Sequence, residues 1–334
     1  MSRVAKYREC ISKFITTSTT LPIYGKGENI VTHNGLKNFI QDMIDDSDNF
    51  LSIFLLTVVN NQNKKNKVNV NSYCAASIVE YLSFLQRLRH KRQIYQEKYG
   101  DCVNDLIPYK VTTCVMDLLY SNLEVTKRYV KNQEKFQKIA EKAIQLVSNE
   151  APEINGDILL EYKSPKITDN LYRFYLNQRM ELQSKYLTLK LIKQESLIQY
   201  FKDTICRLFK LAVSLGWLLT ASDDDTLSRV QEVGILFAIF YQIGLDFSTV
   251  DDDLIYASEH NKITYNYVIN CGLQKSYEDF MNYKQRLITI LIETDLYTRT
   301  VREMIESVDE WMNGFVAVSN PNTDSSIYYS HGPS

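Results

Sequence analysis

The sequence predicts an all-α protein folded as a single large helical bundle. No proline occurs between Pro165 and Pro321, as an array of long helices requires, because proline breaks the interior of a helix. Residues 234–245, GILFAIFYQIGL, are apolar on every side apart from Gln242, which is typical of a helix buried in a large core. Elsewhere, apolar residues recur at helical spacing.

The first part of the chain alternates predicted helices with polar connections. Residues 2–17 have an apolar stripe at helical spacing, and residues 36–43 form a short second helix. The acidic run IDDSD precedes the apolar residues 50–59, and we expect it to cap that helix because Asp and Ser accept hydrogen bonds from exposed N–H groups. The polar run NNQNKKNKVNVNS (60–72) is predicted to be an exposed, mobile connector.

The rest of the chain is also predicted to be helical up to its last residues. The further predicted helices occupy residues 74–99, 101–123, 125–147, 276–293 and 299–315. Residues 74–99 contain neither Gly nor Pro, so we expect a nearly continuous helix there. Residues 1–318 are predicted to form one domain, and 319–334 a disordered tail.

Bulk composition excludes several classes of protein. The formal net charge of −2 gives no reason to expect nucleic acid or an acidic membrane surface as a partner. The six cysteines are scattered, with no C-x-x-C pair, and no apolar run is long enough for a transmembrane segment. The first residues lack the apolar core of a secretory signal. We therefore expect an intracellular protein with free cysteines.

Carboxylates cluster directly after the apolar helix at residues 234–245. Asp246 is followed by Asp251, Asp252 and Asp253. Oxygen ligands at the mouth of a helical core suit Mg²⁺, which in turn binds diphosphates. The alternative is that these carboxylates only cap the next helix and keep the loop solvated.

The same stretch resembles the second aspartate-rich region of the trans-isoprenyl diphosphate synthases, with the pattern F-Q-I-x-D-D-x-x-D followed by [GN]-K-x-[ST]-[FYW]. The second half matches well at residues 261–265, NKITY. The first half is degraded: Leu245 replaces the first aspartate and Thr249 the third. Gln242 and Asp246 remain in register. The resemblance implies a metal role for Asp246, and weaker ones for Asp251 and Asp252.

Further degraded motifs of this family occur elsewhere in the chain. Residues 75–84 resemble the helix that carries the first aspartate-rich motif, but no carboxylate occurs between Glu80 and Glu97. The basic residues Arg89, Lys91 and Arg92 stand near the missing motif. Residues 177–182 resemble G-Q-x-x-D-L, and residues 202–209 resemble K-T-x-x-L-F with an extra residue on each side of Thr204.

The resemblance implies a large helical domain with a central cavity, usually a homodimer, in which Mg²⁺ ions hold an allylic diphosphate. By resemblance, the diphosphate-binding candidates are Lys202, Thr204, Gln242, Lys262, Arg89, Lys91 and Arg92. A solvated basic face is the alternative interpretation of Arg89, Lys91 and Arg92.

Three hypotheses follow. The chain is a pseudoenzyme kept as a regulatory or structural subunit, in a homodimer or a heteromer with an active prenyl synthase, and it binds a prenyl diphosphate without ionising it. Alternatively, it is an active magnesium-dependent prenyltransferase or terpene synthase that recruits other carboxylates. The third hypothesis is an unrelated helical interaction protein.

Overall fold

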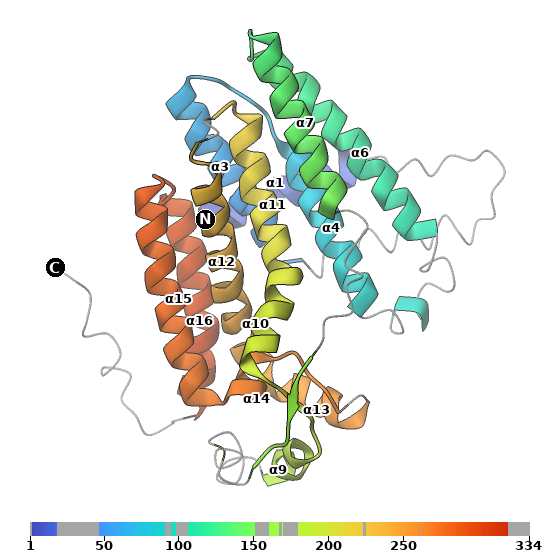
Figure 1. Ribbon diagram of the computed structural model, residues 1–334, viewed down its shortest axis with the longest axis vertical. Coiled ribbons are helices and arrows are strands. Elements are labelled where there is room, and N and C mark those ends of the chain that lie inside the picture. The colour runs from blue at the N-terminus through green and yellow to red at the C-terminus, as the bar shows by residue number, and fades with distance from the viewer. Residues whose placement is uncertain are drawn as a thin grey trace. The chain divides into compact units, whose positions relative to one another are not determined.

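The protein is built almost entirely of helices (Figure 1). The computed structural model describes residues 2–18, 47–90, 95–97, 106–150, 160–166, 169, 180–222, 225–260 and 262–319. The one sheet within these residues has two antiparallel strands, β1 (Tyr162–Lys163) and β2 (Leu191–Ile192). The fold class is therefore all-α, as the sequence predicts. The predicted C-terminal tail falls outside the described residues from position 320 onward.

The chain divides into two compact units. The first unit consists of Met1–Gly156, Cys206–Ile235 and Ile290–Met304. The second unit consists of Asp157–Ile205, Leu236–Thr289 and Ile305–Ser334. Three helices have several residues in both units: α12 (Leu227–Ser248), α15 (Leu273–Glu293) and α16 (Arg299–Ser319).

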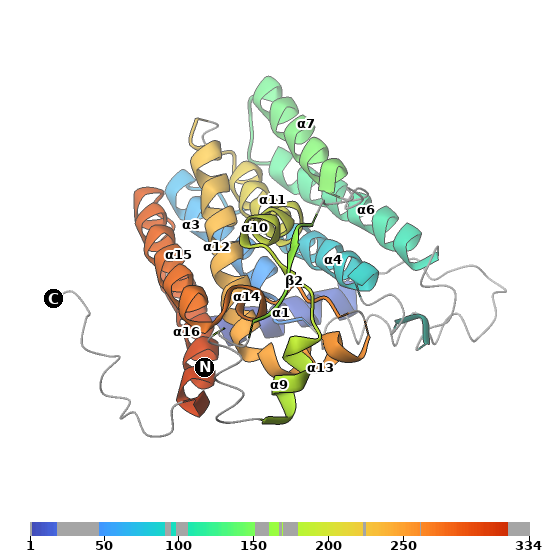
Figure 2. The same cartoon turned by 60° about the horizontal axis from the view of Figure 1, so that its bottom comes forward.

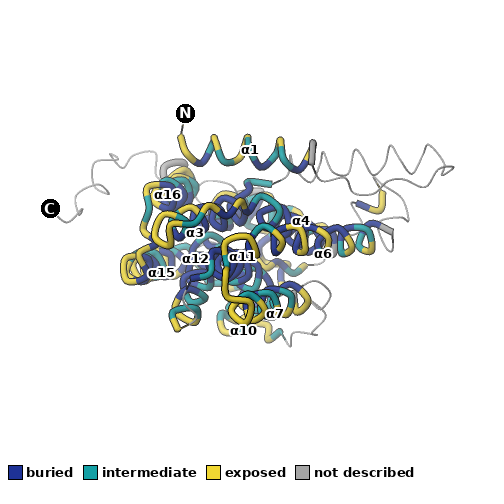
Figure 3. Tube along the Cα trace, turned by 90° about the horizontal axis from the view of Figure 1, so that it is seen from above, coloured by how far each residue is buried: buried dark blue, intermediate teal, exposed yellow. Residues whose placement is uncertain are grey.

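The first unit is a stack of helices built on α4. Its helices are α1 (Arg3–Ser18), α3 (Phe50–Asn66), α4 (Tyr73–His90), α6 (Leu106–Lys127), α7 (Gln133–Glu150) and α11 (Ile205–Leu219). Helix α4 packs against α3 and α6, α1 packs against α3 and α4, and α7 packs against α6 (Figures 1 and 2). The buried faces of α3 and α11 supply much of the apolar core of this unit (Figure 3).

Helix α3 extends further than the sequence predicts. The polar run from Asn60 was expected to be an exposed connector, but the helix continues to Asn66 and ends at Lys67, whose φ of 54° is left-handed. Two lysines in the last turn favour this extension, because they interact well with the negative end of the helix dipole. Gln62 is buried, and its Oε1 accepts a hydrogen bond from Ser222 Oγ at 3.1 Å.

The predicted cap of α3 is visible in part. Asp48 Oδ1 accepts a hydrogen bond from the Phe50 N–H at 2.9 Å, in the first turn. The other two aspartates of the IDDSD run lie outside the described residues. Helix α4 confirms the predicted helix from Tyr73 to His90, and residues 95–97 are helical as well. The residues between these two segments fall in a gap of the description.

The second unit contains short helices around the small sheet. They are α9 (Met180–Leu187), α10 (Gln194–Asp203), α13 (Val250–Glu259) and α14 (Tyr267–Cys271). Helix α13 packs against α9 and α14, and α14 packs against α10 and β2 (Figure 2). An isolated parallel bridge joins Lys190 to Ile263, so the segment before α14 runs beside the start of β2.

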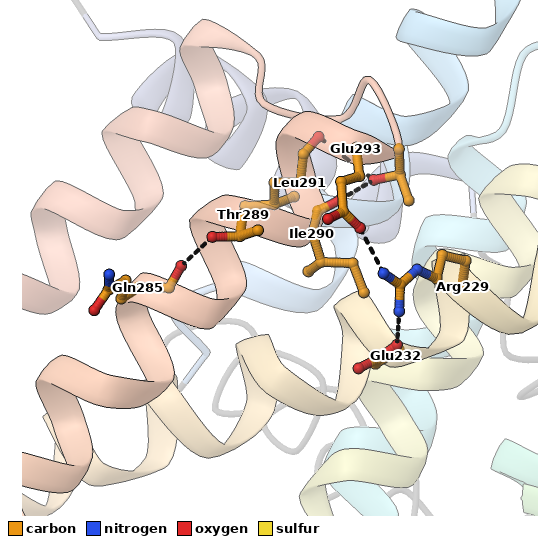
Figure 4. Close-up of polar contacts among 8 residues, drawn as sticks. Arg229, Glu232, Gln285, Thr289, Ile290, Leu291 and Glu293 are labelled. Carbon is orange, nitrogen blue, oxygen red and sulfur yellow. Dashed lines mark hydrogen bonds and ion pairs between the residues drawn. The ribbon is translucent and has the colours of Figure 1, made fainter.

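Helix α12 is the predicted buried helix. Phe237 and Phe240 are fully buried, as expected for a helix without a polar face. Among the helices within the described ranges, α12 alone is long and apolar enough to cross a membrane, and 67% of its apolar 18-residue window is buried inside the protein. In the first unit, Arg229 near the start of α12 forms ion pairs with Glu232 at 2.7 Å and Glu293 at 2.6 Å (Figure 4).

Candidate functional site

The Asp246 carboxylate lies in the last turn of α12, and both of its oxygens accept hydrogen bonds. Gln242, one turn earlier on the same helix, donates from Nε2 to Oδ1 at 2.7 Å. The Tyr267 N–H, in the first turn of α14, donates to Oδ2 at 2.6 Å. The first N–H groups of a helix have no partner within that helix. Asp246 therefore acts as an acceptor for the start of α14.

Asn266 completes this arrangement as the N-cap residue of α14. Its Oδ1 accepts a hydrogen bond from the Ile269 N–H at 3.2 Å. Its Nδ2 donates to the Asp246 carbonyl oxygen at 2.8 Å and to Asp253 Oδ2 at 2.8 Å. One amide side chain thus links the end of α12, the start of α13 and the start of α14. We call Gln242, Asp246, Asp253, Asn266 and Tyr267 the α12–α14 junction.

Burial shifts the pKa of Asp246 upward. The side chain is almost completely buried, and this burial raises the pKa of its carboxyl group well above the ordinary value of 3.8. The hydrogen bonds from Tyr267 and Gln242 oppose the shift, and the negative charge of Asp253 adds to it. The raised pKa means that the fold favours the uncharged form of this acid.

The three aspartates of α13 lie in its first turn. Asp252 is exposed and Asp251 is half-buried. Asp253 Oδ2 accepts a second hydrogen bond, from Thr249 Oγ1 at 2.7 Å. Negative charge at a helix N-terminus is stabilising, because it interacts with the unpaired N–H groups and the positive end of the dipole. This position fits the capping role that the sequence left open beside the metal role.

Lys262 occupies a strained position in the segment before α14. Its φ of 56° is left-handed, which is uncommon for a residue with a side chain. Its N–H donates to the Ala257 carbonyl at 2.6 Å, and its own carbonyl accepts from the Lys190 N–H at 2.7 Å. These two backbone bonds hold the turn, and the side chain is exposed to solvent.

Lys202 and Thr204 lie at the end of α10, and they differ in exposure. Lys202 is exposed, whereas Thr204 is buried and its Oγ1 donates to the Tyr200 carbonyl at 2.7 Å. The ring of Tyr200 stacks on that of Tyr265, with 4.0 Å between ring centroids. The end of α10 therefore lies next to the segment that carries Lys262, and the structure brings these two parts of the resemblance together.

A second polar cluster in this unit was not predicted. The Tyr267 hydroxyl donates to Asp279 Oδ2 at 2.8 Å, and Gln194 Nε2 donates to the same oxygen at 3.0 Å. Lys275 pairs with the other oxygen of Asp279 at 2.8 Å. These contacts tie the starts of α10 and α14 to α15. Asn266, in contrast, could have been found from sequence, because Asn just before a helix is a common cap.

Comparison with solved structures identifies the fold. No family model and no curated protein matches the chain. A geranyltransferase from Legionella pneumophila matches with a TM-score of 0.55 and 11% identity, covering 93% of this chain and 96% of that one. An FPP/GFPP synthase from Zymomonas mobilis matches with a TM-score of 0.55 and 11% identity, covering 91% and 98%. The chain has the isoprenyl diphosphate synthase fold.

A third similar structure contains ligands. It is a geranyltransferase from Helicobacter pylori complexed with magnesium and isoprenyl diphosphate, with a TM-score of 0.53, 11% identity, and coverage of 95% of this chain and 97% of that one. At these identities the likeness establishes the fold alone. Which residues of this chain could hold Mg²⁺ therefore has to be decided from its own side chains.

The described residues do not fit a magnesium site of this kind. They contain no group of three or more His, Cys, Asp or Glu side chains placed to hold a metal ion. Mg²⁺ binds charged oxygen ligands, but Asp246 is buried, favours its neutral form and has both oxygens in hydrogen bonds. Asp253 is likewise committed to Thr249 and Asn266.

The basic residues near the missing first motif are only partly visible. Arg89 is in the last turn of α4, and its side chain is not among the described parts of the structure. Lys91 and Arg92 lie outside the described residues altogether. Their role in binding a diphosphate stays a prediction. Arg87, two residues before Arg89 and not singled out by the sequence, is described.

Proposed function

We propose that this chain is a divergent homologue of the isoprenyl diphosphate synthases that does not turn over prenyl diphosphates with Mg²⁺. The observation that carries the proposal is the state of the Asp246 carboxylate, which is buried and accepts bonds from Gln242 and Tyr267. In the pattern that the sequence resembles, this is the one aspartate still in register. Here its carboxyl group joins two helices and is not free to bind a metal ion.

Losing the metal-binding carboxylates would impair the ionisation of a prenyl diphosphate. Departure of a diphosphate builds up negative charge, and bound cations are needed to stabilise it. A neutral or hydrogen-bonded carboxyl group cannot replace a charged ligand for such a cation. The exposed ammonium groups of Lys202 and Lys262 lie in the same unit as the junction and remain candidates for binding the diphosphate of an intact prenyl substrate.

A chain that keeps the synthase fold but lacks a working metal site is suited to a role as a subunit of a larger assembly. We infer that the chain acts as a regulatory or structural subunit, in a homodimer or in a heteromer with an active prenyl synthase. Support comes from the extent of the fold, since the match to the Legionella pneumophila structure covers 93% of this chain. The shared fold also argues against an unrelated helical interaction protein.

The test measures diphosphate release from prenyl diphosphates by the full chain with Mg²⁺ present. We expect no release above the level of the Asp246→Asn variant, and we expect the chain to co-elute with an active synthase and change its rate. Measurable magnesium-dependent turnover would refute the proposal. Turnover that disappears in an Asp251→Asn, Asp252→Asn variant would instead establish an active enzyme with recruited carboxylates.

A further inference from the structure

Arg87, in the last turn of α4, has two N–H donors without a hydrogen-bond partner. Its Nε and Nη2 atoms are buried away from solvent and have no hydrogen-bond partner. Among the cationic side chains of the described residues, it is the only one with buried, unpartnered nitrogens. Buried polar groups in proteins are nearly always hydrogen-bonded, and a charged donor left unpaired is costly. The two buried N–H groups of Arg87 therefore need a hydrogen-bond acceptor that the described residues do not supply.

The two atoms without partners, Nε and Nη2, lie on the same edge of the guanidinium group. The Nε–H and one Nη2–H of a guanidinium point in parallel from the same edge of the planar group. Together they form a fork that matches two oxygens of a carboxylate or a phosphoryl group. A partner that satisfies both nitrogens must therefore present two oxygen atoms side by side.

The neighbours of Arg87 do not supply that partner. Phe84, on the same face of α4, has its ring centroid 6.0 Å from the guanidinium carbon. Such a cation–π contact involves the face of the guanidinium or its charge and leaves the N–H groups unbonded. The charge of Arg87 lowers the pKa of Glu80, but no described acid makes a hydrogen bond to Nε or Nη2.

Glu80, two turns earlier on the same face of α4, is already engaged elsewhere. Its Oε1 accepts from Ser52 Oγ at 2.6 Å and from the Ser52 N–H at 3.2 Å. Its Oε2 accepts from Ser47 Oγ at 2.6 Å. These bonds hold the carboxyl group to the start of α3. Glu80 therefore interacts with Arg87 only through charge and makes no hydrogen bond to its Nε or Nη2 atoms.

We propose that Arg87 anchors an anion-binding site that takes one phosphoryl or carboxylate group directly, without a metal ion. The site does not depend on the proposed function, because it requires neither turnover nor a prenyl chain. Both donor atoms are out of contact with solvent, so the anion enters after a rotation of the long Arg87 side chain or a shift of the groups that cover it. Arg87 is then the binding residue, and the anion is its counterion.

The experiment measures anion binding to the full chain by calorimetry, with EDTA present to remove metal ions. Inorganic diphosphate is the probe for a phosphoryl ligand and acetate is the probe for a carboxylate ligand. Chloride at equal ionic strength is the control. We expect diphosphate or acetate to bind to the wild type and to bind at least tenfold more weakly to Arg87→Met. Arg128, exposed in the turn after α6, provides the matched control, and Arg128→Met should bind as the wild type does.

A second measurement separates binding from a structural role. Replacing a side chain that has two buried N–H groups without hydrogen bonds relieves a desolvation penalty, so ligand-free Arg87→Met should melt at the same temperature as the wild type or higher. It should also lose the rise in melting temperature that the anion gives the wild type. The proposal is overturned if neither probe binds, if Arg128→Met loses binding equally, or if ligand-free Arg87→Met melts well below the wild type. Arg87→Lys keeps the charge without the fork and should also bind the anion more weakly.

Discussion

The Asp246 carboxylate accepts the Tyr267 N–H at 2.6 Å, and this bond joins the last turn of α12 to the first turn of α14 across 21 residues of sequence. The bond explains why an aspartate persists where the rest of the motif has changed. A helix start needs acceptors for its first N–H groups, and a buried one cannot obtain them from water. Asp246 meets that need even without a metal ion.

Replacing Asp246 by Ala should destabilise the protein more than replacing it by Asn. Alanine leaves the buried Tyr267 N–H without an acceptor, which costs about 1–3 kcal/mol. Asparagine keeps one oxygen for that N–H, and its amide can donate to Gln242 if the Gln242 amide turns over. Denaturant unfolding of both variants measures the difference. Equal losses in the two variants would mean that the Tyr267 bond contributes little.

Asp246 should make the wild type less stable as the pH rises above 3.8, the ordinary value for its carboxyl group. Burial raises the pKa of this carboxyl group in the folded state, so the folded protein binds more protons than the unfolded chain above the ordinary value of 3.8. Unfolding free energy therefore decreases as the pH rises through the folded-state pKa. Facing groups that contribute are Gln242, Tyr267 and Asp253.

Glu80, in the first unit, should also lower the stability of the folded protein as the pH rises. Its pKa is also raised, mainly by burial, against hydrogen bonds from Ser47 and Ser52, with Arg87 lowering it and Asp48 raising it. The measurement is the melting temperature against pH for the wild type, Asp246→Asn and Glu80→Gln. Each variant should flatten the fall seen in the wild type. A variant whose curve stays parallel to that of the wild type excludes its acid as a source of the dependence.

Millimolar Mg²⁺ alone should leave the melting temperature of the wild type unchanged. A metal that binds only the folded state raises stability by mass action, but the carboxyl groups of Asp246 and Asp253 in the junction are already engaged in hydrogen bonds. Differential scanning fluorimetry with Mg²⁺ and with EDTA checks this. A rise in melting temperature that saturates with Mg²⁺ would show a metal site that the described residues do not form.

The sequence predicted the helices well because long apolar stripes without proline in their interior leave few alternatives. Phe237 and Phe240 are buried for that reason. It failed at Asn60–Asn66, where polar composition indicated a connector, because a helix already anchored by ten buried positions can continue through polar residues.

The site was harder to predict than the fold. A pattern around Asp246 gives its place on the helix, but the partner N–H of Tyr267 is 21 residues away and depends on how α14 packs. Nor could the pattern show that Asn266 would bring Asp253 to the same point. Hydrogen-bond partners and burial are properties of the folded chain, and they decide whether a carboxyl group is charged.

The last prediction concerns Gly234, where α12 passes α11 within the first unit. A Cβ atom at this position would lie 2.8 Å from the Phe209 carbonyl oxygen and 2.9 Å from the backbone of Lys210. These are backbone atoms of a packed helix and cannot turn aside, so Gly234→Ala should destabilise the protein by about 1–3 kcal/mol, as overpacking does. Gly314, in α16, is the matched control, because a Cβ there meets nothing within 4 Å. Gly314→Ala should stabilise by about 0.5–1 kcal/mol, since alanine favours a helix interior over glycine. Chemical denaturation of both variants gives the two values, and a neutral or stabilising Gly234→Ala would show that α11 and α12 do not approach as closely as the structure has them.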